Sequence, residues 1–463
     1  MPDASSFHIS NPRCFNPFTI ETYAGGVGSE KYMPLVERLA LTPYMKNIEA
    51  IVVGPDFEEG RYEKESMKLS INAPFDDGTS EFELPIKKIS RKAPYNILDE
   101  DEFEKYSIVG IVGGYLFDNS LVDEVKRLAE AGKNVIIVGV DKDVAGNPLG
   151  PMGYLLPMSD FVYKSYESCA YCREEGTLSN RTEDYFEPVC LKHKDFSEIP
   201  ESSFKSTLEH YQTESLKNKI NLGKLEVFSG NMRGGKTGKM IMHVYKIAKT
   251  KGYSHDDMLF LKPGADKREG EGIGGVVFRK GTITSRMGMA EKYITINAKI
   301  VDDKNPMSFL DDEEILDADI IGIDETQFFS KDLACVIDVL RLNGTDVVCS
   351  SICTDFRYEP FGQTSLPDFK ELPSISAISY IQCDANKVAK NYPICEHSGC
   401  TNRASRIQRF YGGRPASFSD NIFLPGENEY KVHCVPHHIV PGKPKIITRY
   451  KMDKWSSISK EER

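Results

Sequence analysis

An internal repeat constrains the fold of this chain more than any other feature of its sequence. The stretches SIVGIVGGYLFDNS and DIIGIDETQFFSKD align so that Gly110 and Phe117 stand opposite Gly322 and Phe329, at a constant offset of 212 residues. Upstream, ETYAGGVGSEKY aligns with EVFSGNMRGGKT at an offset of 205, and downstream two Tyr-x-x-Cys segments align at 226. Loop insertions between two copies of one domain produce offsets that drift in this way, so we predict a tandem duplication.

Both copies alternate apolar strands with helices. In each copy an apolar strand leads into a glycine-rich turn and a run with helical period, and two further apolar strands flank a second helix. Strands that are apolar throughout are typical of a parallel sheet covered on both faces. We therefore predict an α/β chain with a first domain at 1–194, a polar helical linker at 195–221, a second domain at 222–440 and a C-terminal tail at 441–463.

The composition narrows the class of protein. A length of 463 residues with 40% hydrophobic and 27% charged residues fits a soluble globular chain of more than one domain. The net charge of −11 argues against a protein that coats nucleic acid, which needs a basic face. The N-terminus does not resemble a secretory signal, and no apolar run reaches the roughly 18 residues that a membrane span needs. We therefore predict a cytoplasmic protein without nucleic-acid or membrane partners.

The second copy carries the pattern of a phosphate-binding loop. GNMRGGKT fits G-x-x-x-x-G-K-[ST] and stands between a predicted strand and a predicted helix. Because the first copy repeats the same order of strands and helices, we predict that both domains are of the P-loop type. The glycines let backbone N–H groups wrap the phosphates, and the helix N-terminus adds a favourable potential. Lys236 would neutralise the β- and γ-phosphates of ATP, and the Thr237 hydroxyl would ligate Mg²⁺. The loop residues that we expect to bind the nucleotide are Gly230, Asn231, Met232, Arg233, Gly234, Gly235, Lys236 and Thr237.

Two acidic residues, Asp324 and Glu325, end a buried strand in the same copy. An Asp at this place is suited to hold Mg²⁺ through water, and the adjacent Glu could act as the base for an attacking hydroxyl. Taken alone, an acidic pair at a strand end is more often a solvated turn. Its combination with the phosphate loop favours the functional interpretation.

The order of motifs in the second copy resembles the type II, cellular-type thymidine kinases. After the phosphate loop come LKPGADKR, TSRMG, DETQFF and TDFRYEPFG, followed by a cysteine-bearing segment, so the resemblance covers about 222–440. It implies an ATP-dependent kinase in which Glu325 deprotonates the nucleoside 5′-hydroxyl. It also implies that Asp266 and Arg268 lie near the transferred phosphate.

The same resemblance implies a nucleoside pocket. The matching positions that line the base and sugar are Phe328, Ile352, Phe356 and Phe361, and Tyr430 matches the tyrosine that contacts the nucleoside. Without the resemblance, these aromatic side chains are more often plain core residues. The chain departs from the family pattern at Ile407, where the family has a threonine, and at Pro425, where it has a glycine. These departures remove a polar contact to the base and a backbone donor.

Each copy contains two close pairs of soft ligands of the kind that structural zinc favours. They are Cys395, Cys400, Cys434 and His437 in the second copy and Cys169, Cys172, Cys190 and His193 in the first. A Cys₃His set that occurs twice favours zinc over free thiols. Only position favours His437 over the adjacent His438. In the family that the second copy resembles, a loop stapled in this way is a lasso that closes over the nucleoside base.

The first copy lacks the residues that we expect to do chemistry. Glu30 and Tyr32 stand at phosphate-loop positions, where an acid repels phosphate and a tyrosine cannot ligate Mg²⁺ from that backbone position. Val112 and Gly113 stand where the second copy has its two acids. We therefore interpret the first copy as catalytically dead, with a structural role.

The predicted function is ATP-dependent phosphorylation of thymidine, and of deoxyuridine, to the 5′-monophosphate in nucleoside salvage, with ATP, Mg²⁺ and structural Zn²⁺. Two alternatives stay open. One is a P-loop kinase or NTPase with a different acceptor, and the other is a nucleotide-binding scaffold without turnover. Because the family assembles as homotetramers, the duplication predicts a homodimer that forms a pseudo-tetramer.

Overall fold

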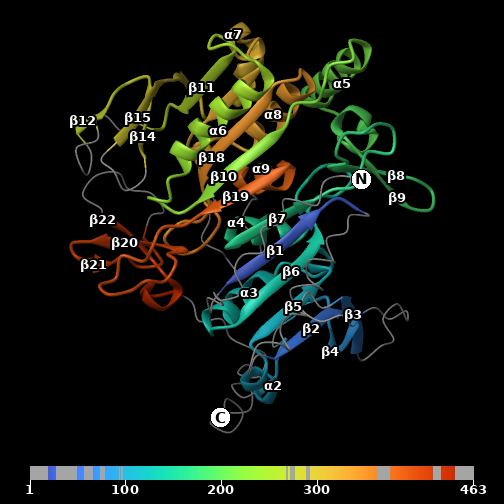
Figure 1. The fold of residues 1–463 in the computed structure, drawn as a ribbon, viewed down its shortest axis with the longest axis vertical. Coiled ribbons are helices and arrows are strands. Elements are labelled where there is room, and N and C mark those ends of the chain that lie inside the picture. Colours follow the sequence, from blue (N-terminus) through green and yellow to red (C-terminus); the bar gives the residue numbers. More distant parts are fainter. Residues whose placement is uncertain are drawn as a thin grey trace, which may run out of the picture.

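Two α/β units, each built on its own β-sheet, make up the computed structural model of the chain (Figure 1). The structure describes residues 19–27, 49–56, 66–72, 79–92, 94, 97–266, 270–271, 277–287, 292–361, 376–420 and 429–443. The predicted duplication of an α/β domain is confirmed, because the two sheets follow one another along the chain and share their strand order.

The first sheet has seven strands in the order β3-β4-β2-β5-β6-β1-β7. Their bounds are Ile20–Gly25 (β1), Ala50–Pro55 (β2), Ser66–Asn72 (β3), Thr79–Ile89 (β4), Ile108–Val112 (β5), Asn134–Val140 (β6) and Phe161–Ser165 (β7). β3 and β4 form an antiparallel hairpin at one edge, and the other pairs are parallel. Every residue of β1 and β6 is buried, as expected for central strands of a sheet covered on both faces.

The second sheet has six parallel strands in the order β16-β11-β17-β18-β10-β19. Their bounds are Leu225–Gly230 (β10), Met258–Pro263 (β11), Lys299–Val301 (β16), Ile320–Ile323 (β17), Asp346–Ile352 (β18) and Lys387–Asn391 (β19). Two short antiparallel pairs lie between β11 and β16 in the sequence. They are Gly270–Glu271 (β12) with Val277–Phe278 (β13), and Thr282–Met287 (β14) with Lys292–Asn297 (β15).

Helices cover both sheets and link the units. Their bounds are Glu100–Lys105 (α2), Leu121–Glu130 (α3), Met152–Met158 (α4), Ser203–Lys217 (α5), Lys236–Lys251 (α6), Glu313–Leu316 (α7), Asp332–Leu342 (α8) and Ala377–Asp384 (α9). The 3₁₀ turns are Gly114–Leu116 (η2), Leu191–His193 (η3), Phe196–Glu198 (η4), Pro306–Asp311 (η5), Thr326–Phe328 (η6) and Val435–His437 (η7). α5 lies between the two copies in the sequence, and the Ser202 hydroxyl caps it by accepting from the Lys205 N–H at 3.1 Å.

A small β-module follows each sheet. The first contains Leu178–Arg181 (β8) and Phe186–Val189 (β9) and ends at η3. The second contains Arg406–Tyr411 (β20), Arg414–Pro415 (β21) and Glu429–His433 (β22) and ends at η7. Figure 1 shows these modules on opposite sides of the junction between the units.

The two units pack against each other through equivalent surfaces. β7 contacts β19, and α4 contacts α9 (Figure 1). Lys164 Nζ donates to the carbonyls of residues 382 and 383 at 3.0 and 2.8 Å. Lys390 Nζ donates to the carbonyls of residues 156 and 157 at 2.8 and 3.0 Å. A single offset of 226 residues turns the first contact into the second, so the interface is isologous, like that of a two-fold dimer.

Two tyrosines repeat this relation. The Tyr166 hydroxyl donates to the Ala385 carbonyl at 2.9 Å, and the Tyr392 hydroxyl donates to the Ser159 carbonyl at 3.0 Å. The same offset relates the two contacts. The units therefore face each other across a pseudo-two-fold axis within one chain.

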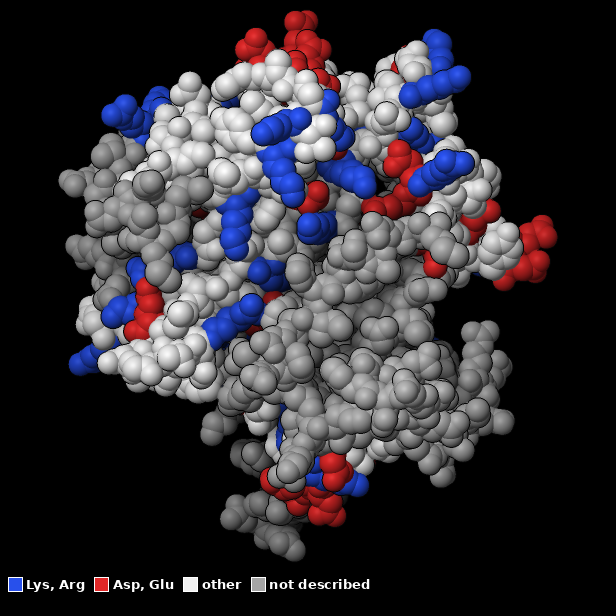
Figure 2. All heavy atoms as spheres, in the orientation of Figure 1, with Lys and Arg blue, Asp and Glu red and all other residues white. Residues whose placement is uncertain are grey.

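The surface of the second unit is locally basic although the chain is acidic overall. Figure 2 shows Lys and Arg side chains spread over the region of α6 and acidic side chains gathered at the edge near α7. α6 contributes four lysines to this surface, at positions 239, 246, 249 and 251, while its first residue, Lys236, is buried. Among the described residues, no helix combines the length and the apolar composition that crossing a bilayer requires.

Candidate active site and metal centres

The predicted phosphate loop joins β10 to α6 and needs glycine for two different reasons. A Cβ on Gly230 would lie 2.1 Å from the Asn391 carbonyl oxygen, so the backbone of β19 leaves no room for a side chain. Gly235 has φ of 72° and forms the left-handed N-cap of α6. Because α6 starts at Lys236, the N–H groups of its first turn are available to a ligand at the loop.

Lys236 lies back over the loop. Its side chain is buried, and Nζ donates to the Asn231 carbonyl at 2.6 Å. Asn231 is fully buried, and its side-chain amide donates to the Ala404 carbonyl at 2.8 Å. The phosphate loop is therefore attached to the β-module that follows the second sheet.

Met232 and Arg233 make a second connection to that module. Met232 packs against two apolar clusters, and each of them includes residues of the second β-module. Arg233 has a left-handed φ of 61°, pairs with the Glu396 carboxylate and donates to the Tyr430 carbonyl at 3.1 Å. These contacts join the predicted nucleotide loop to the strand that carries the predicted nucleoside contact.

The structure brings together the two residues expected to hold Mg²⁺. Asp324 follows β17 and is buried, with 3% of its surface exposed. Its Oδ1 accepts from the Thr237 hydroxyl at 2.9 Å and also from the Ser350 hydroxyl. Sequence reasoning missed Ser350, although a pair of serines at the end of the buried strand β18 is a signal that could have indicated it.

Glu325 occupies a strained backbone position. Its φ is 52°, in the left-handed region, where a non-glycine residue costs roughly 1–2 kcal/mol. The equivalent residue of the first copy is Gly113, with φ of 68°, so both copies make the same turn. The Glu325 carboxylate accepts from the Gln327 side-chain amide, and Gln327 Oε1 accepts from the Ile352 N–H at 3.0 Å. Gln327 was not predicted, and it fixes the orientation of the carboxylate relative to the end of β18.

Asp266 is held close to the end of β11. Its carboxylate lies 3.1 Å from Lys262 Nζ, and both side chains are about 95% buried, with exposed fractions of 4% and 5%. Lys262 was not among the predicted site residues. Arg268 lies outside the described residues.

Three of the predicted pocket residues meet in one apolar cluster. Ile352, Phe356 and Tyr430 pack there with Met232 and Ile407. Ile407 is 3% exposed and Phe356 is 2% exposed. The residue that replaces the threonine of the family therefore adds apolar surface to the place where the family has a polar contact.

The other two predicted pocket residues form a pair of their own. Phe328 and Phe361 contact edge to face, with ring centroids 5.8 Å apart and an interplanar angle of 87°. The Arg409 guanidinium lies 5.3 Å from the centroid of the Phe356 ring and connects β20 to the apolar cluster. Pro425 lies outside the described residues.

Both predicted Cys₃His sets assemble into clusters. In each cluster the four ligand atoms lie within 4.8 Å of one another. The sulfurs of Cys400 and Cys434 are 3.8 Å apart, and those of Cys172 and Cys190 are 3.7 Å apart. Two sulfurs that are each about 2.3 Å from a tetrahedral zinc lie about 3.8 Å from each other. The described cysteines are free thiols, so both clusters fit zinc.

Contacts of the histidines decide which one is the ligand. His437 Nδ1 lies 3.5 Å from Cys395 Sγ and 3.2 Å from Cys434 Sγ. His438 Nε2 instead lies 2.8 Å from the Phe356 carbonyl. Burial lowers the pKa of His438 to about 3, so its ring is neutral and can donate to that carbonyl from Nε2. The choice of His437, which rested on position alone, agrees with this geometry.

In the first copy, Val112 ends β5 and Gly113 follows it, so no carboxylate stands at the equivalents of Asp324 and Glu325. Glu30 and Tyr32 lie outside the described residues. The described part of the first copy therefore keeps the sheet and the metal ligands of the second and lacks its acidic pair.

Comparison with known proteins agrees with the duplicated fold. The model of the family described as "Thymidine kinase" matches residues 57–198 and 223–438. A relative named thymidine kinase, from Coprothermobacter proteolyticus, is 33% identical over 222 residues, which are 48% of this chain and 93% of the relative. The second match spans the whole second sheet and its Cys₃His cluster, and the first match begins after β2 and spans β3 to β7 and the Cys₃His cluster of the first copy. The chain belongs to the thymidine kinase family and carries the family domain twice in tandem.

Proposed function

We propose that the second copy transfers the γ-phosphoryl group of ATP to the 5′-hydroxyl of thymidine and of deoxyuridine. One observation carries this proposal. The Thr237–Asp324 contact, the strained Glu325 and the apolar cluster around Phe356 all border the same end of the second sheet. Ligands of open α/β sheets bind at the carboxyl ends of the strands.

The phosphates of ATP would lie on the N-terminus of α6, where backbone N–H groups and Lys236 offset their charge. When bound, Mg²⁺ would be held by the Thr237 hydroxyl and the Asp324 carboxylate and would neutralise the β- and γ-phosphates. Asp266 and Arg268 would stand beside the transferred group. In-line transfer needs little more from the protein than positioning and charge, which these residues supply.

The nucleophile would be the 5′-hydroxyl, and Glu325 would accept its proton as the oxygen bonds to the γ-phosphorus. The bond from that phosphorus to the β,γ-bridging oxygen breaks at the same time, and ADP leaves. A base must lie within hydrogen-bond reach of the proton that it takes, so its carboxylate must be oriented. The Gln327 amide supplies that orientation. The base and sugar would contact Phe328, Ile352, Phe356, Phe361 and Tyr430, with Ile407 beside them.

The other parts of the chain would support this site. We propose a catalytically inactive first copy at 1–194, a linker at 195–221, an active copy at 222–440 and a tail at 441–463. The zinc of each Cys₃His set would be structural, because four protein ligands leave no open position for water. We propose a homodimer whose four domains form a pseudo-tetramer.

The test is ATP consumption by the purified chain with Mg²⁺, with thymidine, deoxyuridine, deoxycytidine or no nucleoside added. Turnover that depends on thymidine and deoxyuridine is the expected result. Turnover with another acceptor would mean that Ile407 has changed the base specificity. Bound ATP without nucleoside-dependent turnover would favour a nucleotide-binding scaffold and overturn the proposal.

A further inference from the structure

The first copy makes hydrogen bonds and an ion pair with the segment of the second copy that carries Phe356 and Phe361. The Tyr358 hydroxyl donates to the carbonyl of Met158, at the end of α4, at 2.6 Å. Tyr358 is 1% exposed and has a left-handed φ of 65°. The next residue, Glu359, accepts from Lys126 Nζ at 2.8 Å with each of its two carboxylate oxygens.

The Lys126–Glu359 ion pair joins α3 of the first copy directly to this segment. The two side chains are 5% and 25% exposed, so solvent screens their interaction only partly. Burial lowers the pKa of Lys126, but the carboxylates of Glu359 and Asp123 raise it more, and the net pKa lies above its ordinary value. Lys126 therefore presents a permanent positive charge to Glu359.

A tight turn connects Glu359 to the two phenylalanines of the predicted pocket. The Asp355 carboxylate accepts from the Glu359 N–H at 3.0 Å, and the Asp355 N–H donates to the Glu359 carbonyl at 2.8 Å. Phe356 follows Asp355 and packs in the apolar cluster, and the Phe361 N–H donates to the Cys353 carbonyl at 2.9 Å. Because the turn is closed at both ends, a displaced Glu359 would move both phenylalanines.

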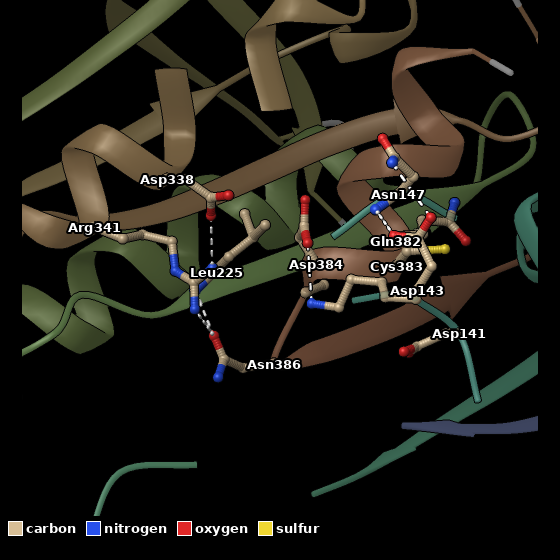
Figure 3. A network of polar contacts seen from close by, with 12 residues as sticks. Asp141, Asp143, Asn147, Leu225, Asp338, Arg341, Gln382, Cys383, Asp384 and Asn386 are labelled. Carbon is tan, nitrogen blue, oxygen red and sulfur yellow. Dashed lines mark hydrogen bonds and ion pairs between the residues drawn. The ribbon is translucent and has the colours of Figure 1, made fainter. Parts of the chain in front are cut away.

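The pseudo-two-fold axis does not repeat this ion pair. At the offset of 212 residues, the equivalent of Lys126 is Asp338 and the equivalent of Glu359 is Asn147. Asp338 pairs with Arg341 of its own helix at 3.1 Å, and the Asn147 N–H donates to the Asp143 carboxylate at 2.8 Å. Figure 3 shows these residues on that side of the interface. Burial and the nearby Asp384 raise the pKa of Asp338 to about 7.

A different ion pair joins the copies on this second side. Lys142 of the first copy lies 3.0 Å from Asp384 of the second, and their side chains are 3% and 9% exposed. Lys142 lies in the first copy's counterpart of the segment that carries Phe356 and Phe361, and no described hydrogen bond or ion pair of Lys142 or Asp384 reaches a predicted nucleoside residue.

Among the described residues, Lys224–Glu175 and Lys443–Glu130 also join the first copy to the later part of the chain, but their side chains are more exposed. Of the two more buried pairs, only Lys126–Glu359 meets the segment that carries Phe356 and Phe361.

We propose that Lys126 of the inactive first copy is a positioning residue for nucleoside binding in the second copy. It acts through Glu359, which sets the turn that carries Phe356 and Phe361. This inference rests on the proposed kinase function of the second copy. It assigns the first copy a role in substrate affinity that is separate from holding the chain together.

The test compares two double variants of the full chain. Lys126→Gln with Glu359→Gln neutralises the pair at the pocket, and Lys142→Gln with Asp384→Asn neutralises the matched pair on the other side. Both keep groups that can hydrogen-bond, which protects folding. For each we would measure the KM for thymidine, the KM for ATP, kcat and Tm. A third variant, Lys126→Arg, keeps the charge and serves as the rescue.

We expect the pocket-side variant to raise the thymidine KM about tenfold and to leave the ATP KM within about twofold, because it displaces groups that contact only the nucleoside. The matched variant should lower Tm without changing the thymidine KM, and Lys126→Arg should keep the KM of the unaltered chain. An unchanged thymidine KM in the pocket-side variant would overturn the inference. So would equal rises in both double variants, which would indicate general loosening of the interface.

The activity of the unaltered chain distinguishes a failure of this inference from a failure of the proposed function. If it turns over thymidine and the pocket-side variant behaves as the unaltered chain does, the inference fails and the proposed function stands. If the unaltered chain shows no nucleoside-dependent turnover, the proposed function fails and the inference falls with it.

Discussion

At the scale of single residues, Glu325 is the position where function and backbone strain coincide. A non-glycine residue in the left-handed region is uncommon, and such positions cluster at functional sites. The first copy makes the same turn with Gly113, which adopts this conformation without strain. The comparison within one chain therefore separates what the turn requires, which is a positive φ, from what chemistry at this place would require, which is a carboxylate.

This comparison predicts opposite effects on activity and stability. Glu325→Gly should lower kcat by a factor of about 10²–10⁴, the range for loss of a general base. It should also leave the free energy of unfolding unchanged or raise it by about 1 kcal/mol, since it removes the left-handed strain. Turnover with thymidine and urea unfolding of the same preparations check both effects.

Glu325→Gln is the matched variant, because it keeps the size of the side chain and the strain while removing the base. It should lose turnover to a similar extent, still bind ATP, and show no gain in stability. Normal turnover of either variant would remove Glu325 from its proposed role.

At the scale of elements, the two β-modules carry equivalent Cys₃His sets but contact different parts of the molecule. The second module holds the strands that carry Ile407 and Tyr430, and Arg233 connects it to the phosphate loop. The first module packs instead on α5 and on Val339 and Leu342 of α8. Loss of the second zinc should therefore affect the site, and loss of the first should affect mainly stability.

We predict that the chain binds two zinc ions and that Cys400→Ser and Cys172→Ser each reduce this number to one. Cys400→Ser should raise the thymidine KM, while Cys172→Ser should lower Tm with the thymidine KM unchanged. Metal content by elemental analysis and steady-state kinetics on the same samples give the answer. Equal kinetic effects of the two variants would contradict this division of roles.

At the scale of the whole molecule, the side chains at the interface differ between the two copies in a way that suits the pairing of unlike copies. Pairing between two second copies would place Asp338 opposite Glu359, two acids in a partly buried contact, which is costly. Pairing between two first copies would place Lys126 opposite the uncharged Asn147. The diverged side chains therefore favour the pairing of unlike copies, which the fusion guarantees.

The proposed pseudo-tetramer predicts a solution mass of two chains, twice 52.0 kDa. Sedimentation equilibrium across a range of protein concentrations would measure it. A species with the mass of one chain at all concentrations would contradict the assembly. The Lys142→Gln and Asp384→Asn variant is the control, because that pair lies within a chain and its loss should not change the mass.

Much of the fold could be predicted because its signals are local. The apolar runs that became β6 and β17 are buried along their whole length, and the phosphate-loop pattern lies between a strand and a helix as expected. The metal ligands could be predicted because close pairs such as Cys434 and His437 bring two ligands together in one turn. Local spacing determines these features whatever the rest of the chain does.

The contacts that orient the site could not be predicted, because they join residues that are far apart in the sequence. Ser350 meets Asp324, and Lys126 meets Glu359, only after the strands have been ordered and the two units have packed. The choice between His437 and His438 likewise depended on a carbonyl from another segment. The sequence by itself determined the duplication, the class of fold and the types of residue at each site. The tertiary structure alone decided which side chains meet, since those meetings depend on packing between elements that no short pattern describes.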